Sequence, residues 1–499
     1  MPISETIEEI TIDQVHAAYR AKTLTVRELV QAYLDRIESI DKQGANLNAV
    51  ITVSAVALDE ADRLDAEFAA SGELTGALFG VPIVVKDQIE TADIATSFGS
   101  IASGDYVPAN DATAIKRLRD AGAIILAKTT LPDFATSWFS TSSRSGLTKN
   151  PYDLSRDPGG SSSGTASAVA ANLSLVGIGE DTGGSIRLPA SFCNLVGLRV
   201  TPGLISRTGM SSLVTPQDTS GPMARTVLDA AKLLDVLVGF DAQDPYTAAF
   251  TVSGHEGSYT DGLEGATLAG VRLGVLRQVF GDANDAEGAS VNRVIDAALE
   301  QYAQAGAELV DIAIDDLDHL VGFTSLYTTR SLADMNAFVG ARPELPIESM
   351  QSIHAEGAYH PKLDLLDAIV AGPVDPKDDP EYLDRLLAQG AFQRSVIGAM
   401  ASNGLDAIVF PDVRLPAPTH ADVMSDRWTC LTYPTNTVIA SQLLMPAVTV
   451  PAGFTENELP VGIEFMTVPY SEALLLKIAR GAEVAVSARR SPTLIEAAE

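Results

Sequence analysis

The chain of 499 residues contains only two cysteines, Cys193 and Cys430. Two thiols cannot form a disulfide framework, and they offer no metal-ligand spacing. No run of 18 or more apolar residues occurs, so no transmembrane helix is expected. The opening residues, MPISETIEEITIDQVHAAYR, are acidic and lack the basic and apolar regions of a secretory signal. We therefore expect a cytoplasmic protein.

Basic residues are also scarce. The chain has 34 lysines and arginines against 65 aspartates and glutamates, which gives a formal net charge of −31. Such a surface repels phosphate backbones and anionic lipids, so we expect neither nucleic acid nor membrane as a partner. The acidic excess is explained most simply by solubility, because no acidic cluster is dense enough to indicate a cationic partner.

Apolar residues make up 46% of the chain, and the pattern alternates between strands and helices. The apolar runs typical of buried strands are 80–85, 123–128, 174–179, 271–276, 406–411 and 445–453. Helices are predicted as a pair within 11–40, capped at Thr23 or Thr25, and again at 54–70 and 221–239. This alternation predicts an α/β fold with one large mixed β-sheet core flanked by helices. Residues 315–400 are more irregular and indicate an inserted helical covering region.

Three consecutive serines raise the first functional hypothesis. Gly160-Ser161-Ser162-Ser163-Gly164 fits the G-x-S-x-G pattern of a nucleophile elbow. An elbow needs a strand directly before it, whereas residues 150–158 (NPYDLSRDP) are typical of a loop. It also needs a histidine, for which His420 is the best candidate. An α/β-hydrolase-type esterase using Ser162 and His420 therefore stays open as an alternative.

A second segment suggests a different nucleophile. Gly183 and Gly184 precede Ser185, between the strand at 174–179 and a helix expected to begin near Ile186. Glycines there allow backbone N–H groups to converge, as an oxyanion site requires, although a turn with an N-cap serine has the same pattern. Lys86 ends an apolar run and is costly to bury in its charged form, so it lies at a rim or has a function.

Together these segments resemble the amidase signature family. The family's Gly-Gly-Ser-Ser-Gly-Gly loop corresponds to 159–164, its Asp-Thr-Gly-Gly-Ser-Ile-Arg turn to 181–187, and its lysine motif to 84–87. Lys86 and Ser161 are 75 residues apart, and Ser161 and Ser185 are 24 apart, as in the family. Further matches at 150–151, 197–202 and 446–453 extend the resemblance over nearly the whole chain.

The resemblance implies a Ser-Ser-Lys triad. Ser185 would be the nucleophile, Ser161 the bridging serine with a cis peptide bond, and Lys86 the base. A lysine can accept a proton only when neutral, which burial favours by lowering its pKa. The backbone amides of Thr182, Gly183, Gly184 and Ser185 would stabilise the oxyanion. This chemistry needs no metal and no organic cofactor.

The resemblance also implies a single amidase signature domain over 1–499, with its core at about 75–240 and the covering region at about 315–400. Residues 134–143 and the covering region would line the acyl pocket. Its candidate substrate-binding residues are Ser137, Ser162 and Phe134, and the neighbouring aromatic candidates are Trp138, Phe139, Phe323 and Tyr327. All these aromatic side chains could equally be ordinary core.

Two residues depart from the family pattern. Ser163 and Asp93 each stand where the family usually has glycine, which concerns the shape of two loops and leaves the triad intact. Ser163 slightly restricts the serine-rich loop, and Asp93 lies in the loop that follows Lys86.

The function implied is a serine amidohydrolase that cleaves the C–N bond of aryl or alkyl amides and anilides through an acyl-enzyme on Ser185. Carbamates and esters are further candidate substrates, and a homodimer is expected by analogy. The amidase component of a tRNA-dependent amidotransferase is a second alternative, although the chain lacks that component's Ala-Arg-Tyr-Asp-Gly motif. A non-catalytic binding protein would not require Lys86, Ser161 and Ser185 together.

Overall fold

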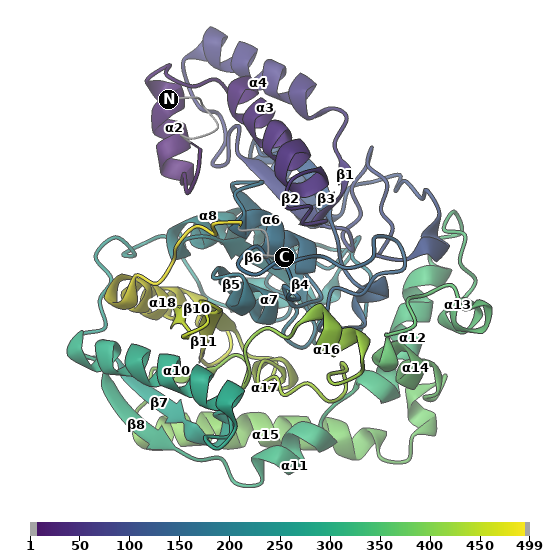
Figure 1. Cartoon of the computed structure of the whole chain (residues 1–499), viewed down its shortest axis with the longest axis vertical. Helices are drawn as coiled ribbons and strands as arrows, with labels where there is room; N and C mark the ends of the chain where they lie inside the picture. Colours follow the sequence, from purple (N-terminus) through teal and green to yellow (C-terminus); the bar gives the residue numbers. More distant parts are fainter. Residues whose placement is uncertain (1–6, 495–499) are drawn as a thin grey trace.

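The computed structural model describes residues 7–494. The ends of the predicted domain, 1–6 and 495–499, lie outside the described residues. One mixed sheet of eleven strands runs through the molecule and helices flank it (Figure 1). The predicted fold class is therefore confirmed.

The order of strands across the sheet is β1-β3-β2-β4-β6-β5-β10-β11-β9-β7-β8. Strands β2, β3 and β4 are parallel, as are β7, β8 and β9, whereas the strands between these two groups pair antiparallel. The strand bounds are β1 Val50–Val53, β2 Pro82–Lys86, β3 Ile124–Thr129, β4 Val176–Asp181, β5 Val196–Arg199, β6 Thr219–Ala224, β7 Arg272–Leu276, β8 Glu308–Ile312, β9 Ala407–Pro411, β10 Ala447–Phe454 and β11 Pro460–Met466.

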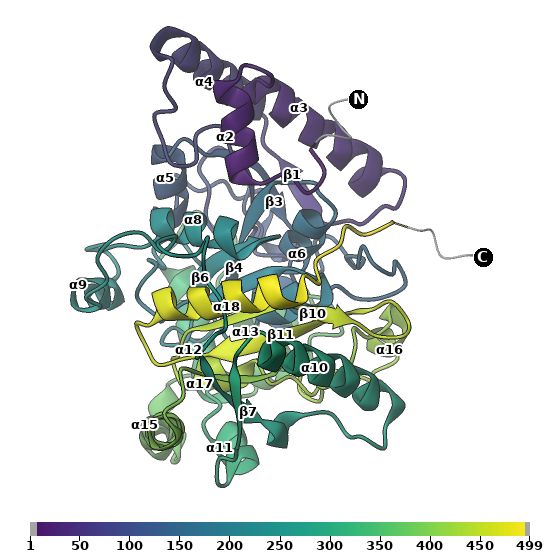
Figure 2. The ribbon, with the colours of Figure 1, turned by 90° about the vertical axis from the view of Figure 1, so that its left-hand side faces the viewer.

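The helices pack around this sheet in several groups. Helices α2, α3 and α4 lie beyond the β1 end of the sheet, and α10 and α18 lie side by side along the β10–β11 hairpin (Figures 1 and 2). The helix bounds are α2 Ile12–Arg20, α3 Val26–Arg36, α4 Ala57–Ser71, α5 Thr113–Asp120, α6 Ser163–Ala170, α7 Arg187–Phe192, α8 Val227–Leu237, α9 Ala248–Val252, α10 Ala286–Gln304, α11 Leu317–Phe323, α12 Tyr327–Gly340, α13 Met350–Glu356, α14 Asp364–Val370, α15 Tyr382–Asn403, α16 His420–Met424, α17 Val438–Gln442 and α18 Glu472–Val486.

The central parallel strands are buried along their whole length. Every residue of β2, β3 and β4 is buried, including the polar residues at their carboxyl ends. Parallel strands covered on both faces have continuous apolar runs rather than alternating ones. This explains why the runs at 80–85, 123–128 and 174–179 are recognisable as strands from the sequence.

The predicted helix pair near the amino terminus is confirmed, and of the two cap candidates Thr23 and Thr25 the structure selects Thr25. Thr25 caps α3, because its side chain accepts a hydrogen bond from the backbone of Glu28 and the Glu28 side chain accepts one from the Thr25 backbone. This reciprocal pair is a capping box. Thr23 instead donates its hydroxyl to the carbonyl oxygen of Ala18.

The helix predicted over 221–239 is wrong in its first part. Residues Thr219–Ala224 form strand β6, which pairs with β4 and β5, and helix α8 begins only at Val227, where Thr226 caps it. The segment carries Gly221 and Pro222, both poor helix formers. A side chain at Gly221 would collide with the Leu198 carbonyl on β5, so close strand pairing decides the structure.

The region at 315–400 consists mainly of helices α11 to α15 (Figure 1). Helices α12, α13 and α14 pack on one another and share an apolar cluster with residues 134–139. The covering region therefore contacts the segment expected to line the acyl pocket. Within residues 7–494, no helix is long and apolar enough to cross a membrane, and no group of three metal-ligating side chains occurs.

Candidate active site

Two adjacent strands bring Lys86 and the glycine-rich turn at 181–187 to the same edge of the sheet. Strand β2 ends at Lys86 and β4 ends at Asp181, and the two strands pair in parallel. The carboxyl ends of parallel neighbours meet at one edge, which is where ligands bind in open α/β sheets. The side chain of Lys86 is completely buried there.

Ser161 lies directly against Lys86. It belongs to the loop before α6, and the peptide bond between Gly160 and Ser161 is cis. The Nζ atom of Lys86 lies 2.8 Å from the Oγ atom of Ser161, within hydrogen-bond distance. The start of helix α6 lies close to the residues that flank β1 and β3. A side chain at Gly164 would collide there with the backbone of Ala49 and Thr130. The glycine therefore allows the serine-rich loop to reach Lys86.

Ser185 lies in the turn between β4 and α7. The backbone amide of Ser162 donates to the carbonyl oxygen of Ser185 at 3.1 Å, which ties the loop that carries Ser161 to this turn. Ser185 is 6% exposed, so it retains a small contact with solvent whereas Lys86 and Ser161 have none. The structure thus places Lys86 and Ser161 in contact and ties the turn that carries Ser185 to the loop that carries Ser161.

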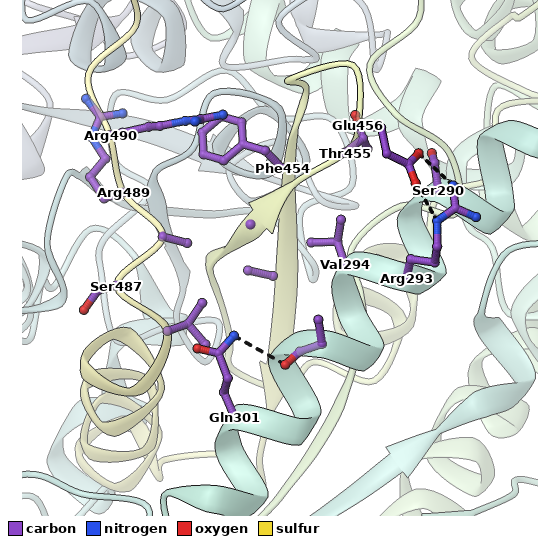
Figure 3. A pocket seen from close by; sticks show the side chains of 15 residues that line it. Ser290, Arg293, Val294, Gln301, Phe454, Thr455, Glu456, Ser487, Arg489 and Arg490 are labelled. Carbon is purple, nitrogen blue, oxygen red and sulfur yellow. Dashed lines mark hydrogen bonds and ion pairs between the residues drawn. The ribbon is translucent and has the colours of Figure 1, made fainter.

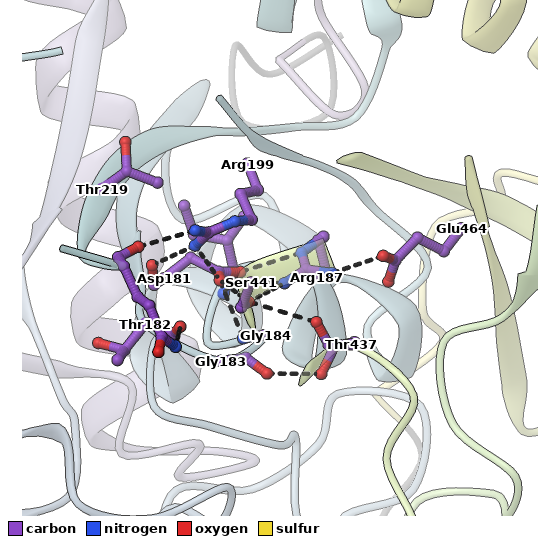
Figure 4. Close-up of polar contacts among 12 residues, drawn as sticks. Asp181, Thr182, Gly183, Gly184, Arg187, Arg199, Thr219, Thr437, Ser441 and Glu464 are labelled. Atoms are coloured by element: carbon purple, nitrogen blue, oxygen red, sulfur yellow. Dashed lines mark hydrogen bonds and ion pairs between the residues drawn. The ribbon is translucent and has the colours of Figure 1, made fainter. Parts of the chain in front are cut away.

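The carboxylate of Asp181 holds this turn in shape (Figure 4). It accepts hydrogen bonds from the backbone amides of Gly184 at 2.9 Å and Ile186 at 3.2 Å. It also pairs with the buried guanidinium groups of Arg187 at 3.1 Å and Arg199 at 2.9 Å. Burial alone would raise the pKa of Asp181, but the two arginines hold it well below its usual range.

Three backbone amides remain available in the turn. The amides of Thr182, Gly183 and Ser185 have no hydrogen-bond acceptor within residues 7–494. The amide of Gly184, in contrast, donates to Asp181. In this structure the Gly184 N–H group is occupied in shaping the turn, whereas the other three expected donors have no acceptor among the described residues.

The segment at 134–139 lies beside the turn. Trp138 packs edge-on against Tyr327 of α12, with ring centroids 5.7 Å apart, and both side chains lie next to the position a Gly183 side chain would take. Phe134 is buried and stacks on Phe98 at 5.6 Å. Phe323 lies elsewhere, under the guanidinium group of Arg385.

The other two candidate substrate-binding residues make internal contacts. The Ser137 hydroxyl accepts a hydrogen bond from the Phe139 amide at 3.0 Å. The Ser162 hydroxyl lies 3.3 Å from both the backbone nitrogen and the carbonyl oxygen of Glu180. Both serines are buried, so each stabilises the local backbone.

The arrangement does not match a nucleophile elbow. Residues 149–160 form turns and loop rather than a strand, and His420 contacts the Thr148 carbonyl oxygen at 3.0 Å. The hydroxyl of Ser162 is directed to the backbone of Glu180, so within the described residues no histidine lies in hydrogen-bond reach of it. The Ser162 and His420 alternative therefore lacks its catalytic contact.

The two departures from the family pattern leave the loops intact. Asp93 has a φ of 70°, the left-handed conformation that glycine adopts freely and that aspartate tolerates better than most residues. Ser163 is the buried first residue of α6.

Several residues contact the site in ways that the sequence did not predict. Glu180 lies beside Lys86, with its Oε2 atom 3.3 Å from the lysine Nζ atom, and both side chains are buried. Thr437 donates its hydroxyl to the Gly183 carbonyl oxygen at 2.8 Å, and Glu464 pairs with Arg187 at 2.5 Å (Figure 4). Thr437 and Glu464 lie more than 250 residues further along the chain, so no local signal links them to the turn.

Charges around Lys86 act on its pKa in opposite directions. Burial lowers the pKa of Lys86, whereas the carboxyl of Glu180 raises it. Burial in turn raises the pKa of Glu180, and Lys86 opposes that change. Because desolvation disfavours every charged form, the site favours a proton arrangement with little net charge.

A surface pocket of about 520 Å³ lies away from this site, between α10, β10 and residues 486–490 (Figure 3). Its lining includes neither Lys86 nor the two serines. The three arginines in it are already matched: Arg293 contacts Glu456 through two hydrogen bonds of 2.8 and 2.9 Å, Arg489 pairs with Glu9, and Arg490 pairs with Glu458. The pocket is therefore separate from the contact between Lys86 and Ser161.

Comparison with known proteins links this geometry to a family. A family model described as Amidase matches residues 28–476. A glutamyl-tRNA(Gln) amidotransferase subunit from Koribacter versatilis (strain Ellin345) is 31% identical over 495 residues, covering 97% of this chain and 99% of that protein. Native peptide amidase from Stenotrophomonas maltophilia has a TM-score of 0.84 and 33% identity, covering 97% of this chain and 98% of that chain. A bacterial aryl acylamidase shares the fold, with a TM-score of 0.77 and 21% identity over 95% of this chain and 96% of that chain.

Proposed function

This chain belongs to the amidase family and is an enzyme that acts on C–N bonds, and from that premise we propose that it is a stand-alone serine amidohydrolase. The observation that carries the proposal is the buried contact of 2.8 Å between Lys86 and Ser161, next to the turn of Ser185. A serine becomes a nucleophile only when a neighbouring base can take its proton, and this contact supplies such a base.

In the proposed reaction, the Ser185 hydroxyl oxygen attacks the carbonyl carbon of the amide. Its proton passes to Ser161, and the proton of Ser161 passes to the neutral amine of Lys86. Ser161 then gives a proton to the departing amine and regains one from Lys86, which leaves an acyl group on Ser185 and a neutral Lys86. Water then attacks the acyl group with the triad acting in the same way, which releases the acid.

The negative charge that develops on the carbonyl oxygen would be met by the turn after β4. The amides of Thr182, Gly183 and Ser185 are the proposed donors, since the Gly184 amide is engaged with Asp181. Each donor of this kind typically contributes about 10²–10³ in rate. The ion pairs of Asp181 keep the turn preorganised, so little reorganisation is needed as the charge develops.

The proposed substrates are peptide amides and aryl amides or anilides, with carbamates and esters to be tested beside them. Similarity to a peptide amidase over nearly the full chain supports the first class. The aromatic pair Trp138 and Tyr327 beside Gly183 supports an apolar or aromatic acyl group. Phe134, Ser137 and Ser162 would act on the acyl site indirectly, through the internal contacts that they make.

The proposal is tested by measuring amine release from a panel of alkyl amides, aryl amides, anilides, peptide amides and aryl carbamates. Ser185→Ala and Lys86→Ala should each reduce turnover at least about a thousandfold, because the triad acts as a unit. Ser162→Ala is the matched control and should lose much less. Unimpaired turnover in Ser185→Ala would contradict the proposal.

A second function is favoured by one comparison. The curated relatives include a component of glutamyl-tRNA(Gln) amidotransferase, so release of ammonia from glutamine within a complex is the alternative. It predicts glutaminase activity and co-purification with further chains from the native host. A chain that purifies alone or as a homodimer, cleaves the amide panel and leaves glutamine intact would exclude it.

A further inference from the structure

Glu180 is a buried acid in direct contact with the proposed base. It is the next-to-last residue of β4, and its side chain is fully buried. The Nζ atom of Lys86 lies 3.3 Å from its Oε2 atom and 3.2 Å from its backbone carbonyl oxygen. With the 2.8 Å contact to Ser161, these are three polar contacts for one nitrogen. The amine is therefore held between Ser161 and Glu180.

Two more polar groups face Glu180. The hydroxyl of Thr182 lies 3.0 Å from Glu180 Oε1 and 2.6 Å from Asp218 Oδ1, so it bridges the two carboxyls. A hydroxyl has one proton to donate, so it cannot satisfy two carboxylates at once. Asp218 also accepts hydrogen bonds from the backbone amides of Leu213 and Val214, which leaves Glu180 the less well solvated acid.

The remaining charged and titratable groups near the pair are Asp181 on β4, Arg199 on β5 and Tyr327 on α12. Asp181 is already neutralised by its contacts with Arg187 and Arg199. Burial raises the pKa of the Tyr327 hydroxyl, so this group stays neutral at ordinary pH. Glu180 is thus the carboxyl in salt-bridge contact with Lys86.

A fully buried lysine on its own tends to become a weak base, since water no longer stabilises its ammonium form. A weak base accepts a serine proton poorly, because proton transfer is most efficient when the pKa of the base lies near the working pH. A carboxylate 3.3 Å away stabilises the ammonium form and reverses part of this loss. The position and the charge of Glu180 therefore allow it to affect the basicity of Lys86, in addition to packing in the core.

We propose that the Glu180 carboxylate is the counter-ion that keeps Lys86 a strong proton acceptor, and that it thereby sets the pH at which Ser161 can be activated. Glu180 is a positioning residue, because it acts through Lys86 and touches no substrate. The second part rests on the proposed function, whereas the first concerns the Lys86–Glu180 pair alone.

The proton balance is simple. At low pH the pair is an ammonium beside a neutral carboxyl group. As the pH rises the carboxyl group loses its proton to solvent first, and in the resulting ammonium–carboxylate pair Lys86 still cannot accept a proton. Once Lys86 has lost its proton to solvent, the neutral amine takes the proton of Ser161 and becomes an ammonium that the carboxylate stabilises. Ser161 then gives a proton to the departing amine and is reprotonated by the Lys86 ammonium, so the pair is regenerated after acylation.

The first test needs no substrate. Protein labelled with ¹³C at the lysine ε-carbon is titrated by NMR, and the Lys86 signal is identified as the one missing in Lys86→Ala. In Glu180→Gln the pKa of Lys86 should be lower than in the native chain by about one to three pH units, because the neighbouring anion is removed. Equal titration points in the two proteins would overturn the proposal.

Two further variants separate charge from packing. Glu180→Asp keeps the anion but draws it back by one methylene group, so its titration point should lie between those of the native chain and Glu180→Gln. Glu472→Gln is the matched control, because Glu472 is also a buried carboxyl but contacts the Thr201 backbone amide. Its Lys86 signal should titrate as in the native chain.

Kinetics then link the pair to the reaction. The acidic limb of kcat/KM against pH should move to lower pH in Glu180→Gln, by the same amount as the NMR titration, with a lower plateau. A residue that only supported the fold would reduce the plateau and leave the limb in place. If no substrate is turned over, the NMR shift still decides the pairing and only the proposed function fails. If turnover depends on Ser185 but neither the limb nor the NMR signal moves, only the role of Glu180 fails.

Discussion

At the scale of single residues, one carboxylate holds the turn that carries Ser185, the proposed nucleophile. Asp181 binds the backbone amides of Gly184 and Ile186 and the side chains of Arg187 and Arg199, all within a buried region. A buried ion network contributes little net stability when intact, but removing one partner leaves uncompensated charge. Asp181 therefore links the shape of the turn to the stability of the whole site.

We expect Asp181→Asn to lower the free energy of unfolding by about 3–5 kcal/mol, since Arg199 loses the carboxylate it contacts. Urea denaturation of both proteins measures this. Asp62→Asn is the control, because its pair with Arg27 is about half exposed and such pairs contribute about 1 kcal/mol or less. A loss in Asp181→Asn no larger than in the control would contradict the role assigned to Asp181.

The sequence predicts Lys86, Ser161 and Ser185 because each stands in a long motif whose spacing matches a family. It does not predict Glu180, although a glutamate among the small and apolar residues of β4 is a visible local signal. The contacts of Thr437 and Glu464 with the turn could not be predicted, because they depend on chain folding over more than 250 residues.

At the scale of elements, the β4–turn–α7 unit depends on close backbone approach. Gly184 has a φ of 127°, which side-chain-bearing residues rarely adopt, and a side chain there would collide with Thr437 before α17. The turn can therefore hold its shape only with glycine at this position. Its amide then points to Asp181, which leaves the neighbouring amides free.

Gly184→Ala should reduce turnover at least about a hundredfold, because the strained turn misplaces Ser185 and the amides beside it. Gly265→Ala is the matched control, since no atom lies within 4 Å of the added methyl group and the backbone there has no positive φ. Amine release from one substrate of the panel measures both variants. Equal activity of the two variants would show that the turn tolerates a side chain.

Burial and strand pairing explain which elements can be predicted from the sequence. The strands β2, β3 and β4 can be found because burial on both faces gives them continuous apolar runs. The prediction misses strand β6, because its sequence TSGPMA has no strand pattern and its structure is imposed by pairing with β4 and β5. The local sequence sets the secondary-structure propensity of a segment. Where that propensity is weak, pairing with other strands determines the structure that the segment adopts.

At the scale of the whole molecule, buried acids give the stability a pH dependence. Burial raises the pKa of Asp133 to about 6, against about 3.9 for an exposed aspartate. Between these values the unfolded chain has lost the proton while the folded chain retains it. Folded protein then binds more protons than unfolded protein, so stability falls as pH rises from about 4 to 6.

The difference between the folded and unfolded pKa of Asp133 corresponds to about 3 kcal/mol of unfolding free energy, which is lost over this pH interval. Asp133→Asn carries no titrating proton, so its stability should fall less over that interval than that of the native chain. Urea denaturation at pH 4 and pH 7 measures both slopes. Identical slopes would mean that Asp133 does not retain its proton in the folded state.

The whole molecule also explains how the site is completed. The chain passes through β1 to β6 first and reaches β7 to β11 later, and β5 and β10 join the two parts in one sheet. Thr437, Ser441 and Glu464 from the second part contact the turn formed by the first (Figure 4). The fold class follows from the family resemblance, but the order of strands that brings these parts together has no signature in local sequence.

The central claim is that Ser185 takes up the acyl group of an amide. The most direct measurement is peptide mass spectrometry of enzyme quenched with acid during turnover of an aryl amide or aryl carbamate. We predict a mass increase equal to the acyl group on the peptide that contains Ser185, and none in Lys86→Ala over the same time. An acyl group found on Ser161 or Ser162, or turnover with no acylated serine at all, would contradict the account.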